Sequence, residues 1–550
     1  MLSIDTVLQS VFGLQQFRPR QREIISDVLA GHDVVCVMPT GAGKSLCFQL
    51  PAVMVKGVTL VVSPLISLMA DQVAQLRRMK IPALLLNSSL TLDQQRQITA
   101  ELHRGFQGLL YVAPERFAAP SFQNLLPKLS TKLFVVDEAH CVSFWGHDFR
   151  PDYLTLADVR KKLGSPVTMS LTATATPQVR RDIVDMLALR DPKMHVTGFD
   201  RPNLAYSARR IESEVEKDAE IVRYLRSQKG SGIVYCSTRK AVEAVAELLH
   251  EKFPERTVAA YHAGMENAVR KNSQARFMSK PDSIAVATNA FGMGINKPDI
   301  RFVIHYNLPG SVEAYYQEAG RAGRDGAPAD CFLLFGTRDL RTQEFFIDKI
   351  GDNNPALKDS DVSRLQVHSR RKLGLMKSYA ENYRCRRRQI LDYFGETTPI
   401  ANCRCDVCSH IAQPRWQPSR DGRPRPSRRS EAPQLAPNLA VPYSSGPALA
   451  AARIKSAPQL NPTKTRSPKA PLSDAPLDAS ATLRFERLKK VRRQLADAQQ
   501  WPAFCIMHDS TLKEVARRSP ATIRELALIK GIGDKKAVHF GPALLKALQD

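Results

Sequence analysis

Between residues 30 and 335, short runs of apolar and β-branched residues alternate with longer segments whose apolar residues recur at helical spacing. The runs are continuously apolar, which is typical of strands that are buried on both faces of a parallel sheet. They form two series, so the pattern predicts an α/β protein with two doubly wound parallel-sheet domains. The predicted strands are 33–38, 59–63, 109–112, 133–136 and 167–171 in the first series, and 232–235, 257–261, 284–288, 302–306 and 331–335 in the second.

The domain borders follow from changes in composition along the chain. The two series separate near residues 199–203, where the sequence is FDRPN. Helical spacing continues to a cluster of cysteines near residue 408. The next segment holds 13 of the 36 prolines and almost no large apolar residues, which predicts a disordered basic linker. Apolar periodicity then returns, enough for a small helical domain. The predicted domains are 1–200, 201–340, 341–410, 411–480 and 481–550.

The charge of the chain is strongly positive and unevenly distributed. Its 550 residues carry a formal net charge of +25, which favours a polyanionic partner such as a nucleic acid. Residues 409–480 have 11 basic and 4 acidic side chains, and residues 481–550 have 14 and 7, so +14 of the total lies in this last quarter. The tail is therefore a candidate electrostatic tether. A generally basic proteome is the alternative explanation for the charge alone.

Cysteine usage and the apolar runs indicate an intracellular protein. The N-terminal sequence lacks the charged start and apolar block of a secretory signal, and no run approaches the ~20 apolar residues of a transmembrane helix. We expect a cytoplasmic protein without a membrane partner, associated with the chromosome if DNA is its partner. Among the cysteines that stand singly, as is typical of reduced thiols, are Cys36, Cys47, Cys141, Cys236 and Cys331.

A glycine-rich loop, PTGAGKS at residues 39–45, follows the first predicted strand and precedes a helical stretch. Its glycines allow backbone N–H groups to turn towards phosphate oxygens, and the helix N-terminus adds partial positive charge. Lys44 would bind the β- and γ-phosphates of ATP and Ser45 would bind Mg²⁺. The general motif has glycine where this chain has Met38, and an ordinary turn before a helix is the alternative. The predicted ATP-binding residues of the loop are Thr40, Gly41, Gly43, Lys44 and Ser45.

A pair of carboxylates, Asp137 and Glu138, follows the strand predicted at 133–136. A carboxylate at the carboxyl end of a strand is well placed to hold Mg²⁺, and a second one beside it can polarise an attacking water. A lone Asp-Glu pair is usually a solvated turn. Its combination with the phosphate loop favours an ATP site.

Three further side chains could complete the ATP site. The amide of Gln21 offers a donor and an acceptor that match an adenine edge, although an ordinary surface glutamine is the common alternative. Arg321 and Arg324 lie three residues apart, on one face of a helix. They could stabilise the charge on a transferring phosphate if the two sheet domains close, or they could simply be a surface pair.

Four cysteines group near the end of the third predicted domain. Cys385 lies in a basic helical segment, and Cys403, Cys405 and Cys408 follow with the spacing C-x-C-x2-C. Four thiolates can close a tetrahedral structural Zn²⁺ site, and free thiols are the alternative.

As an ordered set, these stretches closely resemble the RecQ family of DNA helicases, within helicase superfamily 2. The resemblance covers residues 1–408, about three quarters of the chain. Any one stretch could arise by chance, whereas the ordered set is highly specific. The matching sequences are FRPRQREII (17–25), MPTGAGKS (38–45), VVSPLISLMADQ (61–72), YVAPER (111–116), DEAHCVSFWGHDFRPDY (137–153), SLTATAT (170–176), IVYCSTR (233–239), YHAGM (261–265), ATNAFGMGINKPD (287–299) and YYQEAGRAGRDG (315–326).

The resemblance implies two tandem RecA-like domains, with ATP, Mg²⁺ and Zn²⁺ as cofactors. It implies movement along single-stranded DNA in the 3′ to 5′ direction, coupled to ATP hydrolysis, and duplex unwinding in DNA recombination and repair. The catalytic residues would be Lys44, Asp137, Glu138, Arg321 and Arg324, with Gln21 at the adenine and Ser45 and Asp137 at Mg²⁺. His140 would link the ATP site to DNA, and residues 143–153 would form an aromatic-rich loop that couples DNA binding to hydrolysis. The side chains of this loop are Phe144, Trp145, His147, Phe149 and Arg150.

The chain departs from the family pattern in three places. Phe144 stands where glutamine is commoner, so the coupling could differ in detail. The family usually spaces its loop cysteines C-x2-C-x2-C, which would put a ligand at Asn402, one residue before Cys403. The segment 411–480 has too few apolar residues for the winged-helix domain of many members, which therefore looks absent.

The last segment, 481–550, resembles the HRDC domain, a small helical bundle. It contains the sequence KGIG at 530–533, and such a turn lets backbone N–H groups approach a phosphate. Lys530, Lys535 and Lys536 favour DNA binding over a plain tight turn.

Two other functions remain open from the sequence. One is an ATPase that moves along RNA, or along nucleic acid without strong strand separation. The other is a non-catalytic nucleic-acid binding or annealing protein. The second needs a degraded ATP site, whereas all five predicted catalytic side chains are present. The leading hypothesis is an ATP-dependent DNA helicase.

Overall fold

The computed structural model describes residues 3–88, 90–146, 148–292, 297–353, 357–409, 478–498, 507, 509–529, 532 and 534–549. The chain forms two compact units, the first ending at Pro424 and the second beginning at Arg425, and each is considered by itself. The prediction of a disordered linker over 411–480 falls almost wholly outside the described residues.

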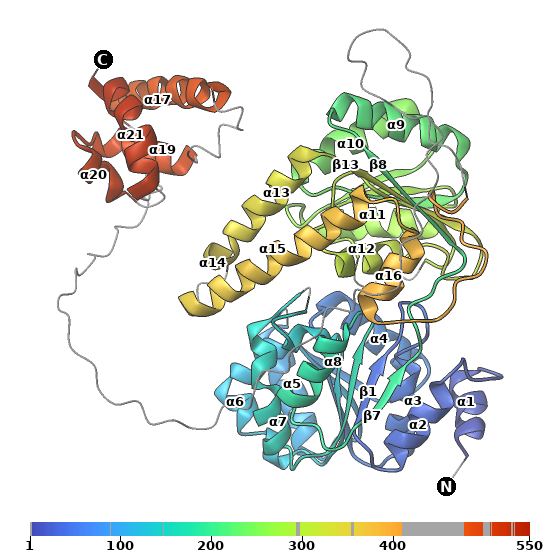
Figure 1. Ribbon diagram of the computed structural model, residues 1–550. Coiled ribbons are helices and arrows are strands. Elements are labelled where there is room, and N and C mark those ends of the chain that lie inside the picture. The colour runs from blue at the N-terminus through green and yellow to red at the C-terminus, as the bar shows by residue number, and fades with distance from the viewer. Residues whose placement is uncertain are drawn as a thin grey trace, which may run out of the picture. The chain divides into compact units, whose positions relative to one another are not determined.

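The first lobe is a seven-stranded parallel sheet with the order β3-β4-β2-β5-β6-β1-β7 (Figure 1). Alternate residues of β1 face opposite layers, because Val35 and Val37 join one apolar cluster and Val34 and Cys36 join the other. Both faces are thus buried, which explains the uninterrupted apolar runs. The strands are β1 (Val34–Val37), β2 (Val58–Val62), β3 (Ala83–Leu86), β4 (Gly108–Val112), β5 (Thr131–Val136), β6 (Val167–Thr172) and β7 (Lys193–Val196).

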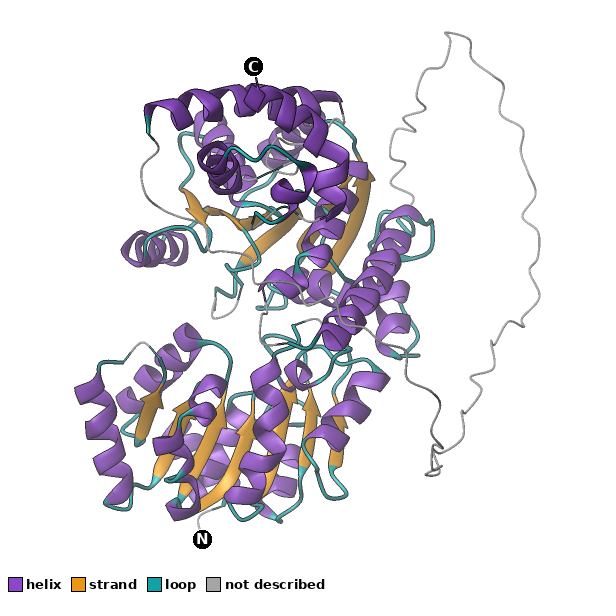
Figure 2. Cartoon of the chain, turned by 90° about the vertical axis from the view of Figure 1, so that its left-hand side faces the viewer, coloured by secondary structure: helices purple, strands orange, loops and turns teal. Residues whose placement is uncertain are grey.

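Helices cover both faces of this sheet, as Figure 2 shows. Residues of α2, α3 and α4 pack with one apolar cluster, and residues of α5, α6, α7 and α8 pack with the other. The helices are α1 (Ile4–Phe12), α2 (Gln21–Leu29), α3 (Leu46–Met54), α4 (Ile66–Arg78), α5 (Leu92–His103), α6 (Pro120–Gln123), α7 (Leu156–Lys162) and α8 (Pro177–Met186).

The second lobe is a six-stranded parallel sheet with the order β10-β11-β9-β12-β13-β8. Helices α9 and α10 cover one face, and α11 and α12 contribute to the cluster on the other. The strands are β8 (Leu204–Arg210), β9 (Ser231–Tyr235), β10 (Val258–Tyr261), β11 (Ile284–Ala287), β12 (Ile300–His305) and β13 (Ala329–Phe335). The helices are α9 (Glu214–Ser227), α10 (Arg239–Lys252), α11 (Asn267–Ser279) and α12 (Val312–Ala319).

The predicted fold class of two doubly wound parallel sheets is confirmed. All ten predicted strands are present, with borders shifted by a few residues. Three strands were not predicted, and β3, β7 and β8 all lie at the edges of their sheets. An edge strand has only one neighbour and is partly exposed. In β7 three of the four residues are exposed, so the strand has no continuous apolar run to reveal it.

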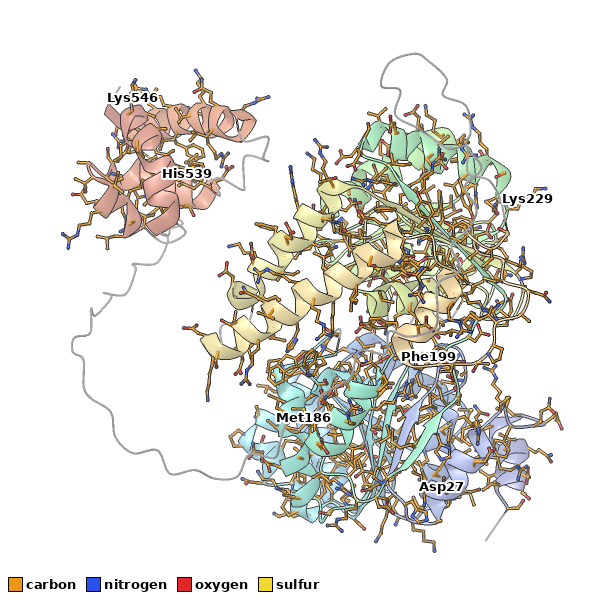
Figure 3. All side chains as sticks on the ribbon, viewed as in Figure 1. Asp27, Met186, Phe199, Lys229, His539 and Lys546 are labelled. Atoms are coloured by element: carbon orange, nitrogen blue, oxygen red, sulfur yellow. The ribbon has the colours of Figure 1, made fainter. Side chains whose placement is uncertain are left out.

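A helical subdomain follows the second sheet and packs at the junction of the two lobes. Phe199, which Figure 3 labels at this junction, stacks on Phe394 with ring centroids 4.3 Å apart. Asp200 forms an ion pair with Arg387, and the carboxylate of Glu396 accepts the backbone N–H of Phe199. The subdomain thereby holds the chain where it crosses between the lobes. Its helices are α13 (Thr337–Asp348), α14 (Ile350–Asn353), α15 (Asp359–Glu381) and α16 (Arg386–Phe394).

The second unit has helices around its own apolar core, which includes Leu488, Leu512, Val515 and Leu544. Its described helices are α17 (Ala479–Ala498), α19 (Asp509–Arg518), α20 (Ile523–Ala527) and α21 (Asp534–Gln549). The prediction of a C-terminal helical bundle is confirmed. Of the helices that the structure describes in either unit, none has the length and apolar character needed to span a membrane.

Candidate active site

The phosphate loop lies between β1 and α3. Gly41 and Gly43 have φ angles of +84° and +83°, a backbone conformation that side chains other than glycine rarely adopt. The ammonium group of Lys44 donates to the carbonyl oxygens of Met38 at 3.1 Å and Pro39 at 3.5 Å. The predicted phosphate-binding cation is thus held within the loop, on acceptors that phosphate oxygens can replace.

The hydroxyl of Ser45 belongs to a chain of polar side chains beneath the loop. It accepts a hydrogen bond from the amide of Gln72 at 3.2 Å, and Gln72 in turn accepts the phenol hydrogen of Tyr111 at 2.8 Å. Gln49 also donates to the Tyr111 oxygen, at 3.3 Å. These contacts orient the Ser45 oxygen, which the sequence predicts as a Mg²⁺ ligand.

Gln21 is 2% exposed and packs directly on the phosphate loop. Its amide nitrogen donates to the carbonyl oxygen of Gly43 at 3.0 Å, and its oxygen accepts the backbone N–H of Arg18 at 2.9 Å. The guanidinium of Arg18 donates to the carbonyl oxygen of Gly41. Gln21 therefore ties the phosphate loop to the segment before α2.

Asp137 and Glu138 lie just beyond the carboxyl end of β5. The carboxylate of Asp137 accepts the hydroxyl hydrogen of Ser63 at 3.3 Å and the backbone N–H of Glu138 at 3.0 Å. Burial and the neighbouring Glu138 raise the pKa of Asp137 to about 7. A divalent cation would favour the ionised form of this carboxylate, so the pair fits the predicted Mg²⁺ site.

His140 connects the carboxylate pair to the end of β6. It is 2% exposed, and its Nδ1 lies 2.9 Å from the hydroxyl oxygen of Thr172 and 3.3 Å from a carboxylate oxygen of Glu138. Thr172 also accepts the backbone N–H of Thr174 at 3.1 Å. A change at Glu138 can therefore be transmitted through His140 to the turn after β6.

Arg321 and Arg324 lie in the turn that follows α12, not on a helix as the spacing predicted, and Arg324 meets the phosphate loop of the first lobe. A Cβ atom placed on Gly41 would lie 3.3 Å from the side chain of Arg324, so the two are in close contact. Arg321 is 4% exposed. Burial and the neighbouring Arg321 lower the pKa of Arg324 to about 10, which still leaves the guanidinium charged at neutral pH. Arg324 thus brings a cation from one lobe to the phosphate-binding loop of the other, while Arg321 lies against Gly292 of its own lobe.

The junction segment supports this arrangement from behind. The guanidinium of Arg201 donates to the carbonyl oxygens of Gly320 at 3.1 Å and Ala322 at 2.8 Å. The amide of Asn203 donates to Gly323 at 2.9 Å. The sequence placed a domain border here, and its role in holding the arginine segment was not predicted.

The aromatic-rich loop rests on α15 of the helical subdomain. Phe144 and Phe149 stack with ring centroids 4.2 Å apart, and the ring of Trp145 lies 3.6 Å from that of His368. The ammonium of Lys372 donates to the carbonyl oxygen of Gly146 at 2.6 Å. His368 and Lys372 thus hold the aromatic end of this loop against α15.

Two further side chains near this loop, Arg150 and His368, are also described by the structure. Arg150 donates to the carboxylate of Asp148 at 3.0 Å and to the carbonyl oxygen of Pro64 at 3.4 Å. Burial and the neighbouring Lys372 and Arg371 lower the pKa of His368, so its ring is neutral at physiological pH. His147 lies outside the described residues.

A cavity of about 520 Å³ opens beside the aromatic loop. Its wall combines Phe144 and Phe149 from the first lobe with side chains from the second lobe and the helical subdomain. The latter include Ser237, Asn307 and Lys372. The cavity therefore combines aromatic faces with polar groups, which suits a nucleic-acid strand.

The four clustered cysteines meet in space. Their sulfur atoms all lie within 4.8 Å of one another, with Cys385 3.5 Å from Cys403 and 3.9 Å from Cys405. A tetrahedral Zn²⁺ with bonds of about 2.3 Å requires sulfur–sulfur distances of roughly 3.8 Å, so the donors fit zinc. Asn402 has a φ of +50°, and Cys403 is the residue whose sulfur joins the set. The predicted ligands are therefore assembled despite the C-x-C spacing.

The predicted DNA contacts of the C-terminal unit are Lys530, Lys535 and Lys536. Lys530 lies outside the described residues. Lys535 and Lys536 lie in α21, and their side chains are outside what the structure describes.

Several residues of the site were not singled out from the sequence, although motif stretches contain some of them. Gln72 and Ser63 lie in the 61–72 stretch and Thr172 in the 170–176 stretch. The sequence could mark these stretches, but only the fold shows which side chain meets Ser45, Asp137 or His140.

Four family models match the chain in order along its length. They are the DEAD/DEAH box helicase over residues 18–183, the helicase conserved C-terminal domain over 216–326, the RecQ zinc-binding model over 337–409 and the HRDC domain over 482–548.

The chain is similar in sequence to known DNA helicases. It is 36% identical over 607 aligned positions to the ATP-dependent DNA helicase RecQ of Haemophilus influenzae, covering 99% of this chain and 95% of that protein. The ATP-dependent DNA helicase RecQ of Bacillus subtilis is 35% identical over 596 positions, covering 99% and 98%. The RecQ-like DNA helicase blm-1 of Caenorhabditis elegans is 42% identical over 73% of this chain and 41% of its own length.

Solved structures confirm the two-lobed fold at low sequence identity. Mss116p bound to ssRNA and AMP-PNP has a TM-score of 0.53 and 16% identity, over 72% of this chain and 88% of that one. The DUF1998 helicase MrfA bound to DNA has a TM-score of 0.51 and 17% identity, over 64% and 50%. At such identities the likeness concerns the fold alone.

Proposed function

Because the chain belongs to the RecQ family of ATP-dependent DNA helicases, we propose that it moves 3′ to 5′ along one DNA strand and separates the duplex ahead, in DNA recombination and repair. It is an ATP-dependent DNA helicase that uses ATP, Mg²⁺ and Zn²⁺, and DNA is its partner. The observation that carries the proposed mechanism is the contact of Arg324 with the phosphate loop, because it brings charge from one lobe to the nucleotide site of the other.

In the proposed ATP site, the phosphates take the place of backbone acceptors. Lys44 exchanges the carbonyl oxygens of Met38 and Pro39 for β- and γ-phosphate oxygens. Gln21 binds the adenine edge while it stays against the loop. Ser45 and Asp137 would hold Mg²⁺, which neutralises developing phosphate charge when it is bound.

Hydrolysis needs an oriented water and a charge stabiliser. Glu138 polarises the attacking water from its position beside Asp137. Arg321 and Arg324 stabilise the charge that spreads over the transferring phosphate, and they can do so only while the lobes are closed. Release of phosphate removes the anion between the lobes, so it favours their separation and couples the chemistry to movement.

The DNA strand is proposed to pass through the cavity beside the aromatic loop. Phe144, Trp145 and Phe149 would stack on bases, and Arg150 would exchange Asp148 for a phosphate. His140 and Thr172 would carry the presence of DNA back to Glu138. We propose that the C-terminal unit adds a second, electrostatic contact through Lys530, Lys535 and Lys536.

We further propose that the chain lacks a winged-helix domain. The RecQ relatives align with it over 596 to 607 positions, although it has 550 residues, so they carry segments with no counterpart here. The zinc-binding model ends at residue 409 and the HRDC model begins at residue 482. The proline-rich segment lies between them. The proposed domains are 1–200, 201–340, 341–410, 411–480 and 481–550. Movement on a DNA track further implies that the protein acts where the chromosome lies.

The test is steady-state ATP hydrolysis with single-stranded DNA, with RNA of the same sequence, and with no nucleic acid. We expect DNA to stimulate hydrolysis by tenfold or more, on the order of the coupling seen between two-state sites, and RNA to stimulate it far less. Lys44→Ala should abolish the DNA-stimulated rate, while Lys128→Ala, an exposed lysine of the first lobe, should not change it. Equal stimulation by RNA, or full activity of Lys44→Ala, would contradict the proposal.

A further inference from the structure

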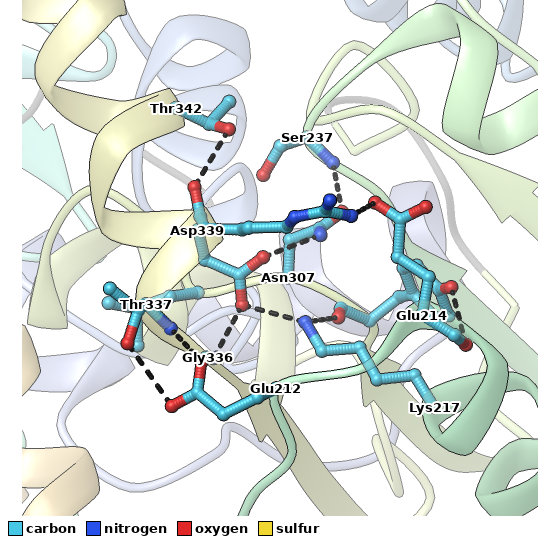
Figure 4. Close-up of polar contacts among 12 residues, drawn as sticks. Glu212, Glu214, Lys217, Ser237, Asn307, Gly336, Thr337, Asp339 and Thr342 are labelled. Carbon is cyan, nitrogen blue, oxygen red and sulfur yellow. Dashed lines mark hydrogen bonds and ion pairs between the residues drawn. The ribbon is translucent and has the colours of Figure 1, made fainter. Parts of the chain in front are cut away.

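A network of polar side chains connects the second sheet to the first helix of the zinc-binding subdomain, on the far side of the cavity from the aromatic loop. Figure 4 shows it around Asp339, which lies on α13 and faces Lys217 of α9 and Asn307 of the segment after β12. Lys217 is 4% and Asp339 3% exposed. Buried charges of this kind need paired partners, so removal of either side chain would leave the other charge buried and uncompensated.

The hydrogen bonds of the network converge on the carboxylate of Asp339, from a loop on one side and from a buried cation on the other. The backbone N–H of Ser237 donates to Oδ1 of Asn307 at 3.0 Å, and Nδ2 of Asn307 donates to Oδ1 of Asp339 at 2.8 Å. The other oxygen of Asp339 accepts the ammonium of Lys217 at 2.8 Å and the backbone N–H of Gly336 at 2.9 Å. In this network the amide oxygen of Asn307 is an acceptor and its amide nitrogen is a donor.

A second side chain of α13 reaches the same loop. The amide of Gln343 donates to the carbonyl oxygen of Leu308 at 2.9 Å and to the hydroxyl of Ser237 at 3.4 Å. Ser237 and Thr238 lie between β9 and α10, and Thr238 caps α10 by accepting the backbone N–H of Ala241 at 3.1 Å. The 237–239 loop is thus held by α13 at one end and by α10 at the other.

This loop faces the proposed DNA path. Ser237, Asn307 and Gln343 line the 520 Å³ cavity whose opposite wall holds Phe144 and Phe149. Arg239, the last residue of the loop, is exposed and begins α10. A cation and a helix N-terminus together suit a phosphate of the strand.

The same subdomain also holds the aromatic loop across the cavity. Helix α15 packs against α13, and its His368 and Lys372 contact Trp145 and Gly146. Both walls of the cavity are therefore fastened to one helical pair, the first wall through Lys372 and the second through Asp339. A shift of α13 would alter the acceptor of Asn307 and hence the loop that follows β9.

We propose that Asn307 and Asp339 are positioning residues that hold the 237–239 loop in its DNA-binding geometry and couple it to the zinc-binding subdomain. This inference rests on the proposed function, because it takes the cavity as the path of the strand. It concerns how tightly DNA is held, and it assigns no chemical step to either residue.

The network permits an exchange experiment. N307D places a second carboxylate against that of Asp339. D339N leaves an amide N–H₂ that faces either the amide nitrogen of Asn307 or the donors of Lys217 and Gly336. The double variant N307D/D339N restores the hydrogen bonds with the carboxylate moved by one position, because the new amide can donate to the new carboxylate. Lys217 then donates to an amide oxygen, so its ion pair is lost in this variant as it is in D339N. Protonation of the introduced carboxyl would restore a donor in N307D, so the assays are run at about pH 8.5, well above the ordinary carboxyl pKa.

The measured quantity is the single-stranded DNA concentration that gives half-maximal ATPase stimulation, with the KM for ATP as the internal comparison. We expect each single variant to raise the half-saturating DNA concentration about tenfold and the double variant to lie between the single variants and wild type, as coupled contacts do in a double-mutant cycle. The KM for ATP should change less. Thr342→Ala is the matched control on α13, because that hydroxyl donates to Arg338 of its own helix.

The outcomes separate this inference from the proposed function. If wild type shows no DNA-stimulated hydrolysis, the proposed function fails. If wild type is stimulated but the single variants respond to DNA as it does, or the double variant is no better than the singles, the positioning role is overturned. Should the singles lose their cooperative melting transition, Gln343→Leu decides instead. A rise of about threefold in half-saturating DNA supports the role, and a value equal to that of Thr342→Ala refutes it.

Discussion

The hydroxyl of Thr40 donates a hydrogen bond of 3.1 Å to the carbonyl oxygen of Gly320, and so joins the phosphate loop of one lobe to the arginine segment of the other. A Cβ atom on Gly320 would lie 3.0 Å from the Thr40 oxygen, so little space separates them. The same carbonyl accepts the guanidinium of Arg201 from the junction. The phosphate loop and the junction segment therefore both donate to one carbonyl group of the arginine segment.

The buried position of Arg324 predicts a distinctive pH profile for Arg324→Lys. The guanidinium, whose pKa is lowered to about 10, remains charged at the pH of an ordinary assay. The same surroundings would lower the pKa of a lysine below its ordinary value of about 10.4. Because the cation is the active form, its contribution is present below that pKa and is lost as pH rises through it. Hydrolysis by Arg324→Lys should therefore begin to fall at a lower pH than hydrolysis by wild type.

The profile is measured as DNA-stimulated ATPase rates at saturating ATP and DNA. Arg301→Lys, which alters an arginine paired with Asp325 at the surface, is the matched control. A flat profile for Arg324→Lys would contradict the buried cationic role.

The zinc site predicts that Cys403 is required and Asn402 is dispensable. Cys403→Ser should reduce the bound zinc to below about 0.2 per chain and lower the melting temperature, because a structural zinc site contributes directly to folding. Asn402→Gly, which tolerates the positive φ of this position, should retain one zinc and a melting temperature close to that of wild type. Zinc content by atomic absorption and thermal unfolding decide this. Full zinc occupancy in Cys403→Ser would show that another group completes the set.

The contact between the rings of Trp145 and His368 predicts a fluorescence signal for DNA binding. A base that competes for the indole ring would change its surroundings, so single-stranded DNA should alter the intrinsic fluorescence of the protein. Trp145→Phe should lose most of this change and part of the DNA stimulation of hydrolysis. Trp416→Phe is the control and should keep the signal. An unaltered response in Trp145→Phe would place DNA elsewhere.

Much of the fold and site could be predicted from the sequence, for identifiable reasons. The buried strands have continuous apolar runs, and Lys44, Asp137 and Cys385 occur in motifs with local spacing. Contacts between distant segments have no such signal. Nothing in the sequence near Arg201 indicates that it donates to Gly320, or that Lys372 meets Gly146, because these pairs depend on how the lobes and the subdomain pack.

The charge of the last quarter predicts that a chain ending at residue 410 binds DNA with a weaker salt dependence. The tail carries +14 of the net +25, and each phosphate that it neutralises adds about 0.7 to the slope of log affinity against log salt on single strands. Binding titrations at several salt concentrations give this slope. An equal slope for the two chains would remove the tail from DNA binding and leave it a regulatory or neutral extension.

The central claim, an ATP-driven motor that separates DNA strands, is tested most directly by unwinding of tailed duplexes of both polarities by the full chain. We expect ATP-dependent separation of duplexes with a 3′ single-stranded tail, little separation of those with a 5′ tail, and none by Lys44→Ala. DNA-stimulated hydrolysis without separation of either substrate would contradict the claim and leave a translocase in its place.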